Sequence, residues 1–377
     1  MFKRKLSTIL AVAMTAVCLS SCGEAADTSD NTIDISSYKQ NLVNISPTQY
    51  GDVMDIDIPA GSYISIIGKA QGPEFWNEVE RGVKKAASDL NKSHGYKGED
   101  KIKVTYNAPS ESEKIGEQVN ILDEELSRYP DAIVIATVDS SACPVQFDLA
   151  KDNGIPVLAM DSYNTNDDVH TIISTDNKES GKTLAEKMTT EIDGEGEIIV
   201  VIDSSESGSA IERCDGIVET IESRYEDVDI VKVISKDRLD EIRETIQEEL
   251  PDDTDIVVED MTEEDIIAYY IESRENVKGC IATDIRSTAK VLGAVDKTGR
   301  QDIAVVGYDG GKEQLEALKA GRLKGIVVQN PFGMGYASVV TAARKIAGED
   351  IDAVVNTGYT WVTKDNMDDE AIVSMLY

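Results

Sequence analysis

Residues 63–90 read YISIIGKAQGPEFWNEVERGVKKAASDL, and this stretch sets the pattern for the rest of the chain. It opens with an apolar, β-branched run, 63–67, which is typical of a strand buried on both faces of a parallel sheet. After a turn with Gly and Pro, apolar residues recur every three or four positions from Phe75 to Leu90. That spacing predicts an amphipathic helix. A strand followed by a helix is the repeating unit of an α/β fold.

The same alternation of short apolar runs and longer amphipathic segments continues along the chain. The further runs predicted as strands are 102–106, 132–136, 155–160, 171–174, 198–202, 230–234, 256–258, 280–283, 303–306 and 325–328. The further segments predicted as helices are 182–192, 211–224, 262–274 and 288–297. About ten strands are more than one twisted sheet holds comfortably. We therefore predict an α/β protein with two parallel sheets and right-handed crossovers.

The composition excludes one class of partner. The chain has 377 residues, which is enough for two domains. It carries 71 acidic and 37 basic residues, which gives a net charge of −34. A negative field of this size repels phosphate backbones, so we expect no nucleic-acid partner. The charge otherwise indicates a solubilising surface and says nothing about a ligand.

The first residues carry a targeting signal. A short basic stretch, 3–5, precedes an apolar segment, 6–19, which is too short and too interrupted by Ser and Thr to remain as a membrane anchor. The following Ser20-Ser21-Cys22-Gly23 resembles the lipobox of bacterial lipoproteins, in which the cysteine thiol is acylated. We predict a signal peptide over 1–21, lipidation with palmitate at Cys22, and a lipid-anchored tether over 22–61 outside a bacterial cell membrane. The alternative is a plain secretory signal in which Cys22 is incidental.

Little in the sequence supports catalysis or metal binding. The chain has two His residues, both in loop-like contexts, and no GxSxG elbow, P-loop or HExxH motif. Cys143, Cys214 and Cys280 are widely spaced and form no CxxC pair. We expect them to be small buried residues. We also expect no enzymatic activity, no metal site and no cofactor.

Polar residues follow most of the predicted strands. In open parallel sheets, ligands bind beyond the carboxyl ends of the strands. The residues at these positions include Lys69, Thr137, Asp139, Asp161, Asp176, Asn177, Asp203, Thr283, Asp284, Asp309 and Gln329. Several are oxygen acceptors or amides that suit ligand hydroxyl groups. The alternative for any one of them is a helix cap, so only their convergence indicates a ligand site.

Six motifs follow one another in the order found in one protein family. They are the stretch quoted above, Gly154-Ile155-Pro156-Val157 with Asp161, Ser174-Thr175-Asp176-Asn177 with Gly181, Arg213 with Gly216, Val306-Gly307-Tyr308-Asp309-Gly310, and Val328-Gln329-Asn330-Pro331 with Gly335. Together they resemble the type 1 periplasmic binding proteins of ABC sugar importers, the ribose- and galactose-binding branch. A closing segment, 361–366, is also similar, so the resemblance spans roughly residues 62–370.

This resemblance implies two Rossmann-like lobes with parallel sheets, joined by a three-strand hinge. The crossings would lie near 173–176, 329–330 and 356–359. The N-terminal lobe would comprise 62–174 plus 330–356, and the C-terminal lobe 175–329 plus 357–377. A ligand that touches both lobes only in the closed state would favour closure by a hinge motion.

The resemblance also assigns roles to individual residues. Phe75 and Trp76 would stack on the apolar face of a sugar ring, and the alternative is that both belong to the core. Asp161 and Asp309 would accept paired hydrogen bonds from ring hydroxyls. Arg213 would donate to the ligand from the C-terminal lobe, and its alternative is an ion pair on the acidic surface.

Three further ligand residues complete this set. Gln329 would serve both as a hinge and as a contact residue. Either Thr283 or Asp284 stands where the family usually has Asn. Lys69 lies in the first loop, within reach of the cleft.

The expected function is capture of a sugar or polyol between the lobes and delivery to an ABC permease, with the protein acting as a monomer. The alternative is a sensing module that docks on a membrane histidine kinase or chemoreceptor. Ser162 stands where the ribose branch often has Arg, and the segment 236–261 is longer than expected. The ligand therefore need not be ribose.

Overall fold

Two separate sheets carry the strands, and the computed structural model describes them within residues 35–377, except 113, 140, 163–168, 170, 252, 253 and 255. Residues Ser36–Tyr377 make up one compact unit. The predicted signal peptide and Cys22 lie outside the described residues. None of the described helices combines the length and the apolar composition that crossing a bilayer requires.

The first sheet is parallel throughout its described strands. Its order is β11-β5-β4-β3-β1-β2, and each adjacent pair runs parallel. The strands are β1 (Tyr63–Ile67), β2 (Lys103–Asn107), β3 (Ala132–Ile135), β4 (Val157–Met160), β5 (Ile172–Ser174) and β11 (Val354–Asn356). We call this sheet with its covering helices the first lobe.

The second sheet repeats the same plan. Its order is β12-β10-β9-β8-β6-β7, and only the β10–β12 pair is antiparallel among the described pairs. The strands are β6 (Gly196–Ile202), β7 (Val228–Ser235), β8 (Val277–Ala282), β9 (Ala304–Tyr308), β10 (Gly325–Gln329) and β12 (Tyr359–Val362). We call this sheet with its helices the second lobe. The predicted α/β fold with two parallel sheets is confirmed, with β12 as an antiparallel strand at the edge of the second sheet.

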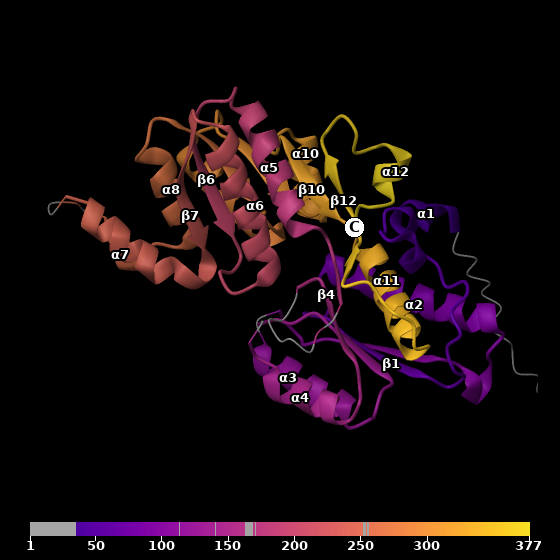
Figure 1. Cartoon of the computed structure of the whole chain (residues 1–377). Coiled ribbons are helices and arrows are strands. Elements are labelled where there is room, and N and C mark those ends of the chain that lie inside the picture. The colour runs from indigo at the N-terminus through magenta and orange to yellow at the C-terminus, as the bar shows by residue number, and fades with distance from the viewer. Residues whose placement is uncertain are drawn as a thin grey trace, which may run out of the picture. The chain divides into compact units, whose positions relative to one another are not determined.

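Helices cover both faces of each sheet (Figure 1). In the first lobe α2 and α11 lie on one face, and α3 and α4 on the other. In the second lobe α5 and α6 lie on one face, and α7 to α10 on the other. The bounds are α2 (Glu74–His94), α3 (Ile115–Leu126), α4 (Pro144–Asp152), α5 (Asn177–Glu191), α6 (Gly208–Arg224), α7 (Leu239–Glu249), α8 (Glu263–Glu272), α9 (Ile285–Thr298), α10 (Lys312–Lys319) and α11 (Pro331–Ile346). Two shorter helices are α1 (Ile35–Val43) and α12 (Glu370–Val373).

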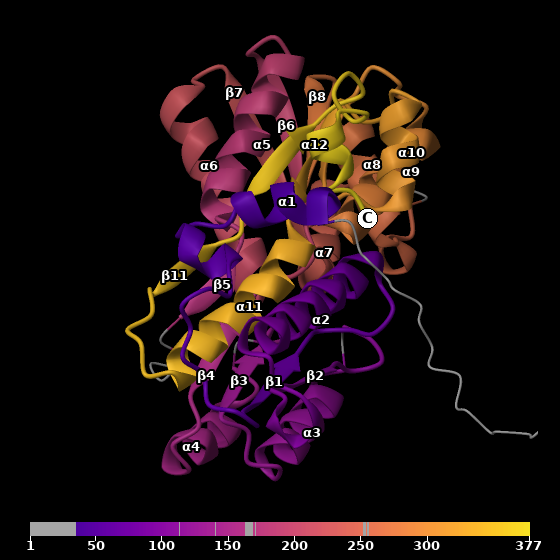
Figure 2. The ribbon, with the colours of Figure 1, turned by 90° about the vertical axis from the view of Figure 1, so that its right-hand side faces the viewer.

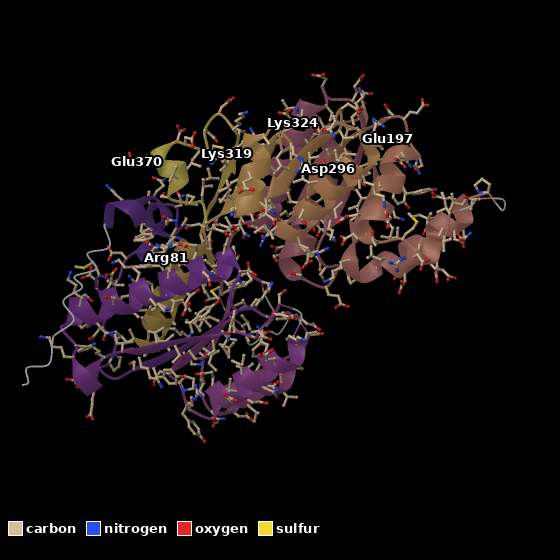
Figure 3. All side chains as sticks on the ribbon, turned by 180° about the vertical axis from the view of Figure 1, so that it is seen from behind. Arg81, Glu197, Asp296, Lys319, Lys324 and Glu370 are labelled. Carbon is tan, nitrogen blue, oxygen red and sulfur yellow. The ribbon has the colours of Figure 1, made fainter. Side chains whose placement is uncertain are left out.

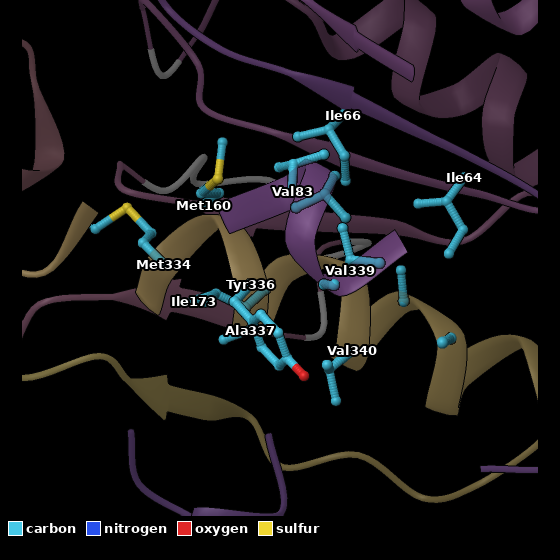
Figure 4. Packing of buried hydrophobic residues seen from close by; sticks show 14 of the residues in the cluster. Ile64, Ile66, Val83, Met160, Ile173, Met334, Tyr336, Ala337, Val339 and Val340 are labelled. Atoms are coloured by element: carbon cyan, nitrogen blue, oxygen red, sulfur yellow. The ribbon is translucent and has the colours of Figure 1, made fainter. Parts of the chain in front are cut away.

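The two faces of each strand supply two different cores. Ile64 and Ile66 of β1 pack with α2 and α11, whereas Ile67 packs with α3 and α4. This follows from the strand geometry, because successive side chains point to opposite faces of a sheet. Figure 4 shows Val83 and Val339 against Ile64 and Ile66 of β1. Such strands are buried on both faces, which explains their nearly continuous apolar sequences.

One helix pair in each lobe packs unusually closely, through glycines. In the first lobe a Cβ added at Gly82 would lie 2.0 Å from the carbonyl oxygen of Phe332, so α2 and α11 could not keep their spacing. In the second lobe a Cβ at Gly216 would lie 2.1 Å from the carbonyl oxygen of Lys178, and α5 and α6 approach each other in the same way. Glycine at the contact lets two helix backbones meet directly.

The run 256–258 is not a strand, which corrects the prediction. Val258 begins a short 3₁₀ helix, η4 (Val258–Asp260), and only Val258 of the three residues is buried. Val257 is 62% exposed, so the run has no sheet to pack into. Three apolar residues are too short a signal to separate a strand from a buried turn.

The segment expected to be a tether over 22–61 packs in the structure from Tyr38 onward. Ile45, Tyr50, Ile56 and Ile58 are buried in the core that β1 shares with α2 and α11. Tyr38 of α1 also stacks on Phe332, with ring centroids 4.1 Å apart. These apolar residues are spaced without a strand or helix period, so their burial was not visible in the sequence pattern.

The chain passes between the two sheets three times, after β5, after β10 and between β11 and β12. Asn330 begins the second of these passages and is fully buried. Its side-chain amide donates to the carbonyl oxygens of Asn41 and Thr357, at 2.7 and 2.8 Å. Asn330 therefore ties α1 and the third passage to the second one. The views in Figures 1 and 2 place α1 beside the start of α11.

The acidic composition appears on the surface as dispersed charge. Asp296 is exposed on α9, Lys319 on α10 and Glu370 on α12, and Lys324 is exposed just before β10 (Figure 3). Many of the described acidic side chains pair locally with Lys or Arg, as Asp296 does with Arg322. Exposed pairs of this kind contribute little to stability, so the charge acts mainly on solubility.

Candidate functional site

A cleft of about 260 Å³ with both polar and apolar lining residues opens where the carboxyl ends of strands from both sheets meet. Its lining comprises Lys69, Ala70, Pro73, Phe75, Trp76, Ser112, Asp161, Asp203, Ser207, Ser209, Ala210, Arg213, Thr283, Asp284, Ile285, Arg286, Asp309 and Gln329. All eight residues predicted to bind the ligand are in this set. The structure therefore brings them together in one place. Their contact with a ligand stays a prediction.

Asp161 presents a carboxylate at the end of β4. Its backbone has φ +62°, in the left-handed region that residues other than Gly rarely adopt. The side chain is 8% exposed, and its Oδ2 lies 3.0 Å from Nζ of Lys69 at the end of β1. Strained backbone of this kind persists where the surrounding structure holds it, and it concentrates at binding sites.

Asp309 occupies the corresponding position at the end of β9. Its φ is +69°, and its side chain is 7% exposed. Oδ1 accepts hydrogen bonds from Nε2 of Gln329 at 2.9 Å and from the hydroxyl of Tyr377 at 2.8 Å. Burial raises the pKa of Asp309, while Arg213 and the two hydrogen-bond donors oppose that rise. The two lobes thus aim one carboxylate each at the cleft.

Arg213 is the buried cation of the second lobe. Its Nε donates to Oδ1 of Asn177 at 2.9 Å, and its terminal nitrogens donate to the carbonyl oxygen of Thr283 at 2.8 Å and to Oε1 of Gln329 at 3.1 Å. The guanidinium also lies 3.9 Å from the ring centroid of Tyr308. These contacts fix the planar group before any ligand arrives. The surface ion pair that the sequence left open for Arg213 is not what the structure contains.

The close approach of α5 and α6 explains this placement. A Cβ at Gly181 of α5 would lie 2.1 Å from the carbonyl oxygen of Arg213 itself. The backbone of Arg213 therefore touches α5. Its guanidinium reaches Asn177, the first residue of α5. A larger residue at position 181 would move Arg213 away from the cleft.

Gln329 links the cleft to the passages between the lobes. Its Oε1 accepts from Oγ1 of Thr175 at 2.9 Å as well as from Arg213, and its Nε2 donates to Asp309. Two donors on the oxygen and one acceptor on the nitrogen determine which way the amide points. Gln329 ends β10, and Thr175 follows β5, so both stand at passages between the sheets.

Phe75 and Trp76 form the apolar wall of the first lobe. They stand at the start of α2, after Pro73, and are 9% and 7% exposed. Their ring centroids lie 5.1 Å apart at an angle of 79°. Both residues belong to the first-lobe core and also line the cleft. The two roles that the sequence left open are therefore compatible.

Thr283 and Asp284 end β8 in different roles. Thr283 is fully buried and serves Arg213 through its carbonyl oxygen. Asp284 caps α9, because its Oδ1 accepts from the backbone N–H of Ser287 at 2.9 Å and its Oδ2 accepts from the Ser287 hydroxyl. Burial raises the pKa of Asp284 to about 6. The helix-cap alternative thus holds at Asp284.

The sequence interpretation missed two groups, of which one contacts a cleft residue and the other lines the cleft. Tyr377 contacts Asp309 from 68 positions away, and no periodic pattern announces it. Arg286 lines the mouth of the cleft and pairs with Asp203 and Glu263. Asp203 was recognised as a polar residue after a strand, but its cation partner was not. The sequence signal that could have identified Arg286 is its position two residues after Asp284, a polar residue at the end of a predicted strand.

The charges in the cleft are largely matched. Lys69 pairs with Asp161, Arg286 pairs with Asp203, and Arg213 joins Asp309 through Gln329. A matched set of fixed donors and acceptors beside an aromatic wall suits a neutral guest that carries many hydroxyl groups. A strongly charged guest would break one of these pairs and leave a half-buried charge without its partner.

Comparison with known proteins identifies a family whose sequence model matches this chain. The sequence model described as a periplasmic binding protein domain matches residues 64–350. The xylitol-binding protein of Mycolicibacterium smegmatis is 24% identical over 71% of this chain and 70% of its own length. The ribose import binding protein of Escherichia coli is 23% identical over 65% of this chain and 80% of its own length.

Solved structures share the fold. A carbohydrate transporter solute binding protein from Agrobacterium radiobacter, in complex with D-arabinose, superimposes with a TM-score of 0.69 at 24% identity, over 84% of this chain and 99% of that one. An ABC transporter solute binding protein from Agrobacterium vitis, with bound D-fucose, gives a TM-score of 0.68 at 24% identity, over 84% of this chain and all of the other.

Proposed function

The chain belongs to the periplasmic binding protein family, and on that premise we propose that it captures a sugar or polyol between its lobes and delivers it to an ABC importer. The observation that carries this proposal is the pair of equivalent carboxylates. Asp161 and Asp309 end corresponding strands of the two sheets, share the same rare backbone conformation and line one cleft. Relatives named for ribose import and xylitol binding support the ligand class.

The chemistry of the cleft favours a hydroxyl-rich ring. A carboxylate accepts from two hydroxyls, and hydrogen bonds to charged groups are each worth about 1.5–3 kcal/mol. Phe75 and Trp76 offer apolar area to the C–H face of a ring. Arg213 supplies donors for ring oxygens from the second lobe. This arrangement binds a guest and needs no bond to be broken, so we propose binding without catalysis.

We further propose that closure of the lobes completes the site. The lobes would be 62–174 plus 330–356 and 175–329 plus 357–377, with residues 45–58 added to the first. Gln329 and Thr175, which stand at passages between the sheets, hydrogen-bond to each other and to the cleft network. A ligand that contacts both walls would therefore stabilise one hinge geometry.

The position of the protein in the cell is proposed from its first residues. Residues 1–21 would direct export, and acyl chains on Cys22 would hold the protein at the outer face of the membrane. Cells grown with a clickable palmitate analogue should label the wild type and the control Cys214→Ser. The Cys22→Ser variant should lose the label. A labelled Cys22→Ser protein would contradict the anchor.

Thermal unfolding with a panel of sugars tests the ligand class. The full-length protein in mild detergent is heated with D-ribose, D-arabinose, D-fucose, D-tagatose, xylitol and, as a non-sugar control, L-leucine. At 100 times its dissociation constant a true ligand adds about 2.7 kcal/mol to the unfolding free energy. We expect at least one sugar or polyol to do so. A panel without any shift would overturn the sugar assignment.

A further inference from the structure

Asp309 is held in place by two neutral donors that come from different elements. Gln329 of β10 and Tyr377, which follows α12, both donate to Oδ1, at 2.9 and 2.8 Å. Within the described part of the chain no hydrogen bond to Oδ2 is found. One carboxylate oxygen is therefore saturated, and the other is left for a guest.

The orientation of the Gln329 amide is itself fixed, so its Nε2 cannot readily turn away from Asp309 and be replaced by water. Thr175 and Arg213 both donate to Oε1 of Gln329, and this forces Nε2 towards Asp309. Gln329 thus supplies one of the two hydrogen bonds to Oδ1 of Asp309. The Tyr377 hydroxyl supplies the other.

Tyr377 also reaches the opposite wall of the cleft. Its ring meets the ring of Phe75 edge-on, with centroids 5.9 Å apart and an angle of 76°. Phe75 in turn contacts Trp76 edge-on. A continuous line of aromatic rings therefore runs from the first-lobe helix α2 to the carboxylate of the second lobe. The sequence offered no sign of this line, because Tyr377 stands far along the chain from both partners.

We propose that Tyr377 is a positioning residue of the cleft, whose hydroxyl fixes Asp309 so that Oδ2 faces the ligand and whose ring ties that carboxylate to the aromatic wall of the other lobe. This inference rests on the proposed sugar-binding function. A carboxylate fixed before binding loses less freedom when the ligand arrives, and this preorganisation raises affinity. Without the hydroxyl, Oδ1 of Asp309 keeps only the hydrogen bond from Gln329, so the carboxylate is held less firmly about its side-chain bond.

The charged and titratable groups that face Asp309 define how its ionisation should respond. They are Arg213 of α6, Tyr308 of β9, Tyr377, and Asp161 across the cleft with its partner Lys69. The Tyr377 hydroxyl donates to the ionised carboxylate, so its removal should raise the pKa of Asp309. A ligand that needs the ionised form should then be lost at a higher pH as the solution is acidified.

The test is Tyr377→Phe in the full-length protein, which keeps the ring contact with Phe75 and removes only the hydroxyl. Calorimetric titration uses the sugar with the largest thermal shift in the panel above. We expect affinity at pH 7.5 to fall about tenfold and the acid limb of the affinity–pH profile to move up by about half a pH unit.

The matched control is Tyr50→Phe. Its hydroxyl donates to a carboxylate, Asp352, at the same 2.8 Å, but that carboxylate lies outside the cleft lining, whereas Asp309 is part of it. That variant should lose stability and keep the wild-type affinity and pH profile. Equal effects of the two substitutions on affinity would reduce Tyr377 to a structural role and overturn the proposal.

A ligand-free measurement separates this inference from the proposed function. The ¹³C shift of the Asp309 carboxyl is titrated by NMR in the wild type and in Tyr377→Phe, without sugar. A titration midpoint that is higher in the variant than in the wild type supports the positioning role, even if no sugar binds the wild type. A lack of sugar binding would contradict the proposed function and leave this inference standing. Coincident midpoints would sink the inference whatever the sugar panel gives.

Discussion

The first and the second lobe share one backbone plan and differ in the chemistry that they bring to the cleft. Both sheets have the same strand order, and Asp161 and Asp309 end corresponding strands with nearly the same left-handed φ. The first carboxylate is held by a cation, Lys69, at 3.0 Å. The second is held by the neutral donors of Gln329 and Tyr377. The backbone therefore fixes where a carboxylate stands, and the neighbours decide how it is held.

The close helix pairs of the two lobes likewise share their packing and differ in the side chains that they bring to the cleft. The pair α2–α11 and the pair α5–α6 both meet through glycines that leave no room for a Cβ. At the cleft, α2 presents the rings of Phe75 and Trp76, whereas α6 presents the guanidinium of Arg213. Packing constrains the helix contact, and the cleft-facing end of each helix is free to differ. A ring-shaped guest would meet an apolar wall on one side and a charged wall on the other.

The largest expected effect comes from breaking the helix contact that the lobes share. Gly335→Ala would place a Cβ 2.0 Å from the carbonyl oxygen of Val79, and Gly216→Ala would place one 2.1 Å from that of Lys178. Because the obstacle is backbone, no rotamer change relieves it, and each substitution should cost about 3 kcal/mol of unfolding free energy. Chemical denaturation measures this cost in each variant.

The control for this prediction is Gly116→Ala in α3, where an added Cβ meets nothing within 4 Å. It should leave stability unchanged or raise it by up to about 1 kcal/mol, since Ala is the better helix former. If only one of the two substitutions, Gly335→Ala or Gly216→Ala, lowered the free energy of unfolding, the close helix pairs of the two lobes would not be equivalent in packing. A small cost at both positions would contradict the direct backbone contact.

A smaller effect should distinguish the two cleft walls. Arg213→Met removes the donors to Asn177, Thr283 and Gln329, and sugar affinity should fall by about 2 kcal/mol, roughly 30-fold. Trp76→Leu keeps an apolar wall without its flat face, and we expect a loss of about 1 kcal/mol, roughly fivefold. Calorimetric titration with the same sugar compares both.

The control for the wall comparison is Trp361→Phe, because Trp361 packs on Gly325 of β10 and is not part of the cleft lining. It should bind the sugar as the wild type does. A Trp76→Leu variant that binds more weakly than Arg213→Met would reverse the ranking of the walls. In that case apolar stacking, and not the charged network, would dominate recognition.

Much of the architecture was predictable from local patterns. Double-sided apolar runs marked the strands, and the three-to-four spacing from Phe75 to Leu90 marked α2. Both patterns report burial of one short segment, so they need no knowledge of its partners. They failed at 256–258, where three residues carry too little periodicity, and over 45–58, where buried apolar residues follow no period.

The sequence by itself determined the alternation of strands and helices and the polar residues at the strand ends, because burial and turn chemistry act within a few residues. Only the tertiary structure decided how those residues are held. The left-handed backbone at Asp161 and Asp309, the network of Gln329 and the contact of Tyr377 depend on segments that meet only after the sheets assemble. A local pattern cannot encode a hydrogen bond between residues 68 positions apart, since its geometry is set by everything folded between them.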